Sequence, residues 1–154
     1  MVIGVAGANY HAIAHQTLFA TQDRDLLLPL DADDVLACWR SCLDCGLELW
    51  NAGEPFDLPV DRDSATRVVA RRATVQAEDA HGLQVDLNLV MAGFDFEEVW
   101  RDRSTFLLEG TSIPVARLEH IVESKRAAGR DKDFLFLRQH RDVLEEILRR
   151  ERKR

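Results

Sequence analysis

The sequence has few of the residues that mark membrane proteins, secreted proteins or disulfide-stapled folds. Its 154 residues include only 3 cysteines, 4 prolines and 1 tyrosine. No apolar run approaches the ~20 residues that a membrane-spanning helix needs. The apolar stretch at residues 2–8 lacks the basic start of a secretory signal, since the first basic residue is Arg24. These absences predict a cytoplasmic protein with reduced thiols and no membrane partner.

Internal repeats, low-complexity tracts and linkers rich in proline, glycine and serine are also absent. A chain of this size can bury roughly 70% of its unfolded surface around one core, so it needs neither a disulfide nor a metal to fold. We therefore expect a single domain over residues 1–154.

Basic residues are outnumbered by acidic ones, 20 against 27, which argues against a protein that coats nucleic acid. The charge is unevenly placed, because residues 116–154 contain 12 basic and 8 acidic side chains. An acidic body with a basic C-terminal segment could hold metal ions in one half and an anionic ligand near the other. The alternative is a pair of solvated helices that end in an exposed basic tail formed by Arg149, Arg150, Arg152, Lys153 and Arg154.

The pattern of apolar residues, glycines and prolines predicts strands and helices that alternate along the chain. We expect strands over residues 2–6, 24–30, 67–76 and 83–90, a strand and loop over 47–59, and a hairpin over 105–115. We expect helices over residues 8–16, 31–45, 94–103 and 117–128, and from 131 onward. Such a chain forms a mixed sheet with helices packed on it, of the α/β or α+β class, and ends in two helices.

Two acidic residues stand where an apolar strand begins, in the segment TQDRDLLL at residues 21–28. Side chains two residues apart point to the same face of a strand, so Asp23 and Asp25 would present their carboxylates side by side. Adjacent anions repel one another unless a cation lies between them, and Mg²⁺ prefers oxygen ligands. The alternative is a solvated pair at the edge of a loop.

A third acidic residue lies in the segment LQVDLNL at residues 83–89. The alternation there leaves Gln84, Asp86 and Asn88 on one face of the strand and the apolar residues on the other. An aspartate in the middle of a strand usually costs stability. That cost is recovered if Asp86 shares metal with Asp23 and Asp25, in a site that holds two Mg²⁺ for phosphoryl transfer. The alternative is that Asp86 faces solvent on an open sheet.

The order of these motifs resembles the nucleotidyltransferase superfamily, and most closely its minimal bacterial branch, which is often found as toxin-like genes. The resemblance lies in Gly7-Ala8-Asn9, a short helix with His15, Thr21-x-Asp23-x-Asp25 before three leucines, and Val85-Asp86-Leu87. Residues 113–121 (IPVARLEHI) and 125–133 (KRAAGRDKD) are similar to the last strand and lysine-rich helix pair of that branch. The resemblance covers nearly the whole chain and implies a nucleotidyltransferase-like mixed sheet flanked by helices.

By position, the resemblance also implies a role for individual residues. Asp23 and Asp25 would bind Mg²⁺ and the triphosphate, and Asp86 would complete the metal site and help to activate the attacking hydroxyl. The residues implied in nucleotide binding are Gly7, Ala8 and Asn9 as a loop around the phosphates, Thr21, and the cations Lys125, Arg130 and Lys132, which Asp133 would orient.

The implied activity is Mg²⁺-dependent transfer of a nucleoside monophosphate from an NTP to a hydroxyl acceptor, with pyrophosphate as the leaving group. The acceptor is RNA such as tRNA, a protein side chain or a small molecule, and the basic C-terminal helix favours a nucleic acid. The branch further indicates the toxin of a toxin–antitoxin pair, with a cognate antitoxin as partner. The alternative is a degenerate member that keeps the fold as a binding or regulatory module.

Three features depart from the family pattern. Ala8 stands where the family loop has glycine or serine, so the hydroxyl donor is missing. Phe19 stands two positions before Thr21, where an arginine is common. Most relatives carry a helix before the first strand. Its absence here leaves an edge or pocket wall that is exposed or is filled by a homodimer partner. The alternative is that this segment is missing through a misplaced start codon.

Cysteine and histidine motifs offer two further interpretations. Cys38, Cys42 and Cys45 have the Cys-x3-Cys-x2-Cys spacing of radical enzymes with an iron–sulfur cluster, but they fall within a predicted helix, so we expect reduced, buried thiols. His11 and His15 could bind Zn²⁺ from one helix face, but the sequence offers no obvious third ligand.

Overall fold

The computed structural model describes residues 1–152, so Lys153 and Arg154 of the predicted basic tail lie outside the described residues. The strands are β1 (Val2–Ile3), β2 (Arg24–Leu27), β3 (Glu48–Asn51), β4 (Glu54–Pro55), β5 (Val75–Glu78), β6 (Gln84–Asn88), β7 (Ser104–Leu108) and β8 (Thr111–Val115). The helices are α1 (Gly4–Ile13), α2 (Ala32–Asp44), α3 (Arg62–Arg71), α4 (Phe96–Arg101), α5 (Leu118–Ala128), α6 (Asp131–Gln139) and α7 (Arg141–Glu151). None of these helices is long and apolar enough to span a membrane.

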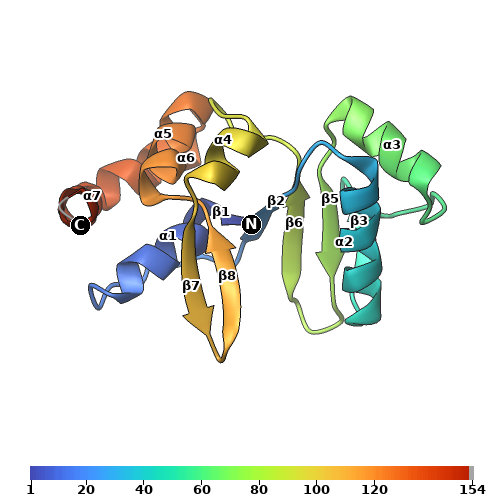
Figure 1. The fold of residues 1–154 in the computed structure, drawn as a ribbon, viewed down its shortest axis with the longest axis horizontal. Coiled ribbons are helices and arrows are strands. Elements are labelled where there is room, and N and C mark those ends of the chain that lie inside the picture. The colour runs from blue at the N-terminus through green and yellow to red at the C-terminus, as the bar shows by residue number, and fades with distance from the viewer. Residues whose placement is uncertain (153–154) are drawn as a thin grey trace.

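The strands form one mixed sheet in the order β4-β3-β5-β6-β2-β1-β8-β7, which confirms the predicted mixture of helices and sheet (Figure 1). Strand β2 runs parallel to β6, whereas β1 pairs with β2 and β5 pairs with β6 in antiparallel fashion. The parallel register places Asp25 beside Asp86. Two segments that are far apart in the sequence therefore meet at the centre of the sheet.

Two apolar clusters hold the sheet, one on each face. Helices α2 and α3 cover β3, β5 and β6 through a cluster that includes Trp39, Val68 and Leu87. On the other face, α1, α5 and α7 pack over β1 and β2 through a cluster that includes Ile3 and Leu27. Among residues 1–152, this second cluster contains no side chain from β3, β5 or β6. The second face of those three strands is therefore not covered by the helices that pack over β1 and β2.

The first strand is shorter than the sequence predicts, because it ends at Ile3 and α1 begins at Gly4. A continuous apolar run such as residues 2–8 suits a buried helix as well as a buried strand, so its pattern could not place the boundary. Gly7 and Ala8 are consequently buried inside α1, and the Asn9 side chain bonds both backbone groups of Phe19. The predicted glycine-led loop over residues 7–9 is therefore wrong.

The prediction of a strand over residues 67–76 is also wrong in its first half, where α3 runs to Arg71 and β5 begins only at Val75. Two β-branched residues in α3 favoured the strand, but the Asp61 carboxylate accepts a hydrogen bond from Ser64 N at 2.8 Å and caps the helix. The predicted last helix divides at His140 into α6 and α7, so three helices rather than two close the chain.

Capping and turn residues in the sequence predicted the ends of several elements correctly. Asp31 caps α2 by accepting hydrogen bonds from Asp33 N and Asp34 N, and α5 ends at Gly129 with a φ of 64°. The hairpin of β7 and β8 turns at residues 109–110. The three cysteines are free thiols on or next to α2, but Cys38 and Cys42 are only half-buried and Cys45 is exposed, which corrects the expectation of burial.

Candidate active site

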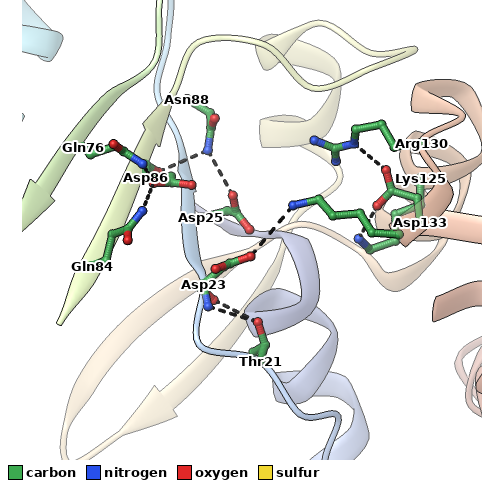
Figure 2. A network of polar contacts seen from close by, with 11 residues as sticks. Thr21, Asp23, Asp25, Gln76, Gln84, Asp86, Asn88, Lys125, Arg130 and Asp133 are labelled. Carbon is green, nitrogen blue, oxygen red and sulfur yellow. Dashed lines mark hydrogen bonds and ion pairs between the residues drawn. The ribbon is translucent and has the colours of Figure 1, made fainter. Parts of the chain in front are cut away.

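The structure brings the three acidic residues together at the boundary between the covered and the open part of the sheet. Asp25 and Asp86 lie opposite each other on the neighbouring strands β2 and β6, so their side chains share one face. Asp23 precedes β2 by one residue, and Figure 2 shows its carboxylate on the same side as that of Asp25. The carboxylate from the later strand therefore faces the same space as the earlier pair.

Side-chain amides hold two of these carboxylates. Gln76 Nε2 and Gln84 Nε2 both donate to Asp86 Oδ1, at 3.0 and 3.1 Å, and Asn88 Nδ2 donates to Asp25 Oδ1 at 3.3 Å (Figure 2). These three amide hydrogen bonds engage the Oδ1 atoms and not the Oδ2 atoms of Asp25 and Asp86. Alternation along residues 83–89 could identify Gln84 and Asn88. Sequence predicted that the strands containing Gln76 and Asp86 are neighbours, but it did not specify the register that pairs these two residues.

The electrostatic environment of Asp25 disfavours its negative charge. Burial raises the pKa of Asp25 above its ordinary value, and the charges of Asp86 and Asp23 raise it further. The hydrogen bond from Asn88 and the charge of Lys125 oppose this rise but do not cancel it. A cation bound between the carboxylates would relieve the repulsion.

Positive charge lies across from the acids, on α5 and at the start of α6. Lys125 Nζ lies 2.8 Å from Asp133 Oδ1, and Arg130 Nε donates to Asp133 Oδ2 at 2.6 Å. The Asp133 side chain is fully buried. Burial alone would raise the pKa of Asp133, but the hydrogen bonds from Arg130 and Lys125 outweigh it and hold that pKa below its usual range. Asp133 thus pairs with Lys125 and Arg130, whereas Lys132, the third cation that it was expected to orient, lies near Asp23 instead.

A cleft of about 1380 Å³ separates the two groups of charges. Lys132 reaches toward the acids, with Nζ 4.0 Å from Asp23 Oδ2. Thr21 Oγ1 accepts a hydrogen bond from Asp23 N at 3.2 Å and shapes the turn that leads into β2. The predicted site residues that line the cleft are Thr21, Asp23, Asp25, Asp86, Lys125, Arg130, Lys132 and Asp133. Gly7, Ala8 and Asn9 do not line it.

A glycine that the sequence interpretation missed lies at this cleft. Gly4 joins β1 to α1 with a φ of +65°, and a Cβ at this position would come within 2.2 Å of Asp25 Oδ2. Only glycine avoids both the strained backbone and this contact. The first turn of α1 has no side-chain cap, and Gly4 and Val5 line the cleft. The strand-to-helix junction that meets the cleft is therefore at Gly4 rather than at Gly7.

The donor chemistry of the three carboxylates fits a hard divalent cation, because carboxylate oxygens are the ligands that Mg²⁺ prefers. In the side-chain arrangement of residues 1–152, however, no group of three or more His, Cys, Asp or Glu side chains encloses a metal position. A bound ion would need the three carboxylates to move closer together. The three carboxylates thus have the ligand chemistry that Mg²⁺ prefers, and their mutual repulsion favours a bound cation. Their positions fit a metal site only in part.

The histidine alternative does not bring its two ligands together. His11 is buried, with Nδ1 2.6 Å from Glu151 Oε1 and Nε2 2.9 Å from the Ala116 carbonyl oxygen. Both ring nitrogens of His11 are therefore engaged away from His15. His15 Nδ1 instead lies 3.3 Å from an Arg150 nitrogen.

Comparison with known proteins adds no family assignment, because no family model and no curated protein matches the chain.

Proposed function

We propose that this chain is a Mg²⁺-dependent nucleotidyltransferase that moves a nucleoside monophosphate from an NTP to a hydroxyl acceptor. One observation carries the proposal: three carboxylates from two separate segments meet across a cleft from three cations. An NTP brings about four negative charges, so its binding requires both metal and basic side chains. The cleft presents both classes of group.

Each group has a distinct task in this proposal. Asp23, Asp25 and Asp86 would hold Mg²⁺, which when bound neutralises the triphosphate and the pyrophosphate leaving group. Lys125 and Arg130, immobilised by Asp133, would bind phosphate oxygens without a large loss of side-chain entropy. Asp86 Oδ2, free of the glutamine amides, would accept the proton of the attacking hydroxyl.

The first turn of α1 offers a further phosphate site in place of the predicted loop. A helix begins with backbone N–H groups that lack helical partners, and these groups attract anions. Because α1 has no side-chain cap and opens at Gly4 beside Asp25, a phosphate there would lie next to the carboxylates.

Thermal unfolding with nucleotide tests the proposal. NTP with Mg²⁺ should raise the melting temperature, and the combined change Asp23→Ala and Asp25→Ala should abolish that rise. The matched control is Asp44→Ala with Asp57→Ala, which removes two exposed carboxylates away from the cleft. Release of labelled pyrophosphate from a γ-labelled NTP would report the transfer itself. An unchanged melting temperature for the wild-type protein would refute the proposal.

Two observations favour a second candidate, a degenerate member that binds nucleotide without transferring it. Gly7 and Ala8 are buried in α1, and the described acids do not yet enclose a metal position. This candidate predicts a nucleotide-dependent rise in melting temperature with no pyrophosphate release. The two measurements together therefore separate the enzyme from the binding module.

A further inference from the structure

A single row of side chains crosses the open part of the sheet and ends at the acids. Backbone register pairs Trp50 with Gln76, Gln76 with Asp86, and Asp86 with Asp25. Side chains in register share one face, and Leu49, which precedes Trp50, is buried on the opposite face. Neighbouring strands lie about 4.8 Å apart, and Trp50 and Asp86 are two strands apart, so their backbones are separated by roughly 10 Å. A small molecule on this face can therefore contact the indole and the acids at once.

This open face carries negative charge without compensating cations. Strands β3, β5 and β6 contain no lysine and no arginine. Glu48, Glu78 and Gln84 form the next row of the same face, beside Trp50, Gln76 and Asp86. Glu48 is exposed and Glu78 is half-buried. A polyanionic acceptor would meet only like charge here.

Three arginines of the predicted basic tail are engaged in ion pairs. Arg149 and Arg150 both pair with Glu146 on α7, and Arg152 pairs with Glu119 on α5. These contacts place two glutamates beside three arginines and so reduce the positive charge that a nucleic acid would meet on this part of α7.

We propose that the open face of β3, β5 and β6 binds the acceptor, and that this acceptor is a cationic small molecule with hydroxyl groups. The inference rests on the proposed function, because it names the acceptor for that site. Trp50 would stack against the molecule, and Glu48 and Glu78 would pair with its ammonium groups. A hydroxyl oxygen forms the new bond to the α-phosphorus, the bond to pyrophosphate breaks, and the hydroxyl proton passes to Asp86.

A pair of probes with the same sugar backbone, one with charged amines and one with neutral amides, tests this assignment. The cationic probe is the disaccharide of two glucosamine units, and the neutral probe is its N,N′-diacetylated form. Calorimetric titration at mildly acid pH, where the amines are protonated, should show binding of the cationic probe that weakens with added salt. The neutral probe should bind roughly tenfold more weakly.

Variants locate the binding on the face. Glu48→Gln with Glu78→Gln, and separately Trp50→Ala, should each weaken binding of the cationic probe roughly tenfold. The matched control is Glu54→Gln with Glu109→Gln. Glu54 pairs with Asn51 on the opposite face, and Glu109 lies in the β7–β8 turn, so this control should bind as the wild type does.

Three results would overturn the assignment: equal binding of both probes, equal binding by the Glu48/Glu78 and control variants, or a short RNA that displaces the cationic probe. The nucleotide-dependent melting shift is measured separately without a probe. Loss of that shift counts against the proposed function, whereas a retained shift with failed probe binding counts against the acceptor assignment alone.

Discussion

The placement of Asp25 in the candidate site opposes stability. Its pKa is raised by burial and by the neighbouring acids, so the folded protein holds the ionised carboxylate less favourably than the unfolded chain does. We predict that Asp25→Asn raises the melting temperature at neutral pH by about 2–4 °C, because the amide keeps the Asn88 contact without the charge. The same change should abolish the nucleotide-dependent shift, whereas Asp44→Asn should alter neither quantity appreciably.

The pH dependence of this effect has a definite sign. Above the raised pKa of folded Asp25 the stability penalty is complete, and it disappears as the pH falls below the ordinary pKa of an aspartate. The stability difference between Asp25→Asn and the wild type should therefore shrink on acidification. Urea unfolding at a series of pH values measures it, and a difference that grows toward acid pH would contradict the prediction.

Asp133 behaves in the opposite way. Its pKa is lowered in the fold by Arg130 and Lys125, so its stabilising contribution is complete above the ordinary aspartate pKa and is lost as the pH falls. Asp133→Asn leaves the Lys125 ammonium, only 12% exposed, without a charged partner. We predict a loss of about 2–4 kcal/mol in the free energy of unfolding, measured in urea.

The control for this change is Asp131→Asn, an exposed carboxylate in the first turn of the same helix. It should cost about 0.5 kcal/mol through the helix dipole alone. If the two variants lose the same free energy of unfolding, the buried ion pairs of Asp133 add no more stability than an exposed carboxylate does.

At the scale of residues, sequence identified the charged side chains of the cleft and missed two residues next to them, Gln76 and Gly4. Asp23, Asp25 and Asp86 were visible because carboxylates at strand positions are unusual and alternate predictably. Gln76 was missed because its role depends on the register of β5 against β6, which sequence did not specify. Gly4 was missed because an apolar run on both sides hid the end of the strand.

At the scale of elements, the junction of β1 and α1 is the feature that places backbone next to Asp25. Gly4→Ala would force a side chain into a φ of +65° and bring its Cβ against Asp25 Oδ2. We predict a cost of about 2–4 kcal/mol in urea unfolding, together with loss of the nucleotide-dependent shift as the carboxylate is displaced.

The matched control for Gly4 is Gly46→Ala, at a φ of +81° with no neighbouring atom within 4 Å of the added Cβ. It should cost about 1–2 kcal/mol from backbone strain and leave the nucleotide-dependent shift intact. If both variants behave alike, contact with Asp25 is not what requires glycine at position 4.

Elements with local signals were predictable, and those that depend on tertiary pairing were not. Asp31 and Gly129 delimit α2 and α5 through capping chemistry that can be identified in a few residues. In contrast, Val68 and Val69 in α3 favour a strand by propensity, and packing in the cluster of Trp39 together with the Asp61 cap favours the helix instead. The break at His140 likewise has no strong sequence signal.

At the scale of the whole molecule, the two apolar clusters share one sheet. Leu87 belongs to the cluster under α2 and α3, and Leu118 to the cluster under α1 and α5. We predict that Leu87→Ala and Leu118→Ala each lower the free energy of unfolding by about 2–5 kcal/mol within a single transition. Circular dichroism and tryptophan fluorescence should report the same midpoint, and two separate midpoints would contradict a single cooperative domain.

The central pairing of β2 with β6 also sets when the candidate site can assemble during synthesis. A nascent chain that has emerged only through α3 holds Asp23 and Asp25 without Asp86, and the cations of α5 and α6 emerge later still. The ribosome must therefore release almost the entire polypeptide before these carboxylates and cations can face one another. An unfinished copy of the protein lacks part of the candidate site.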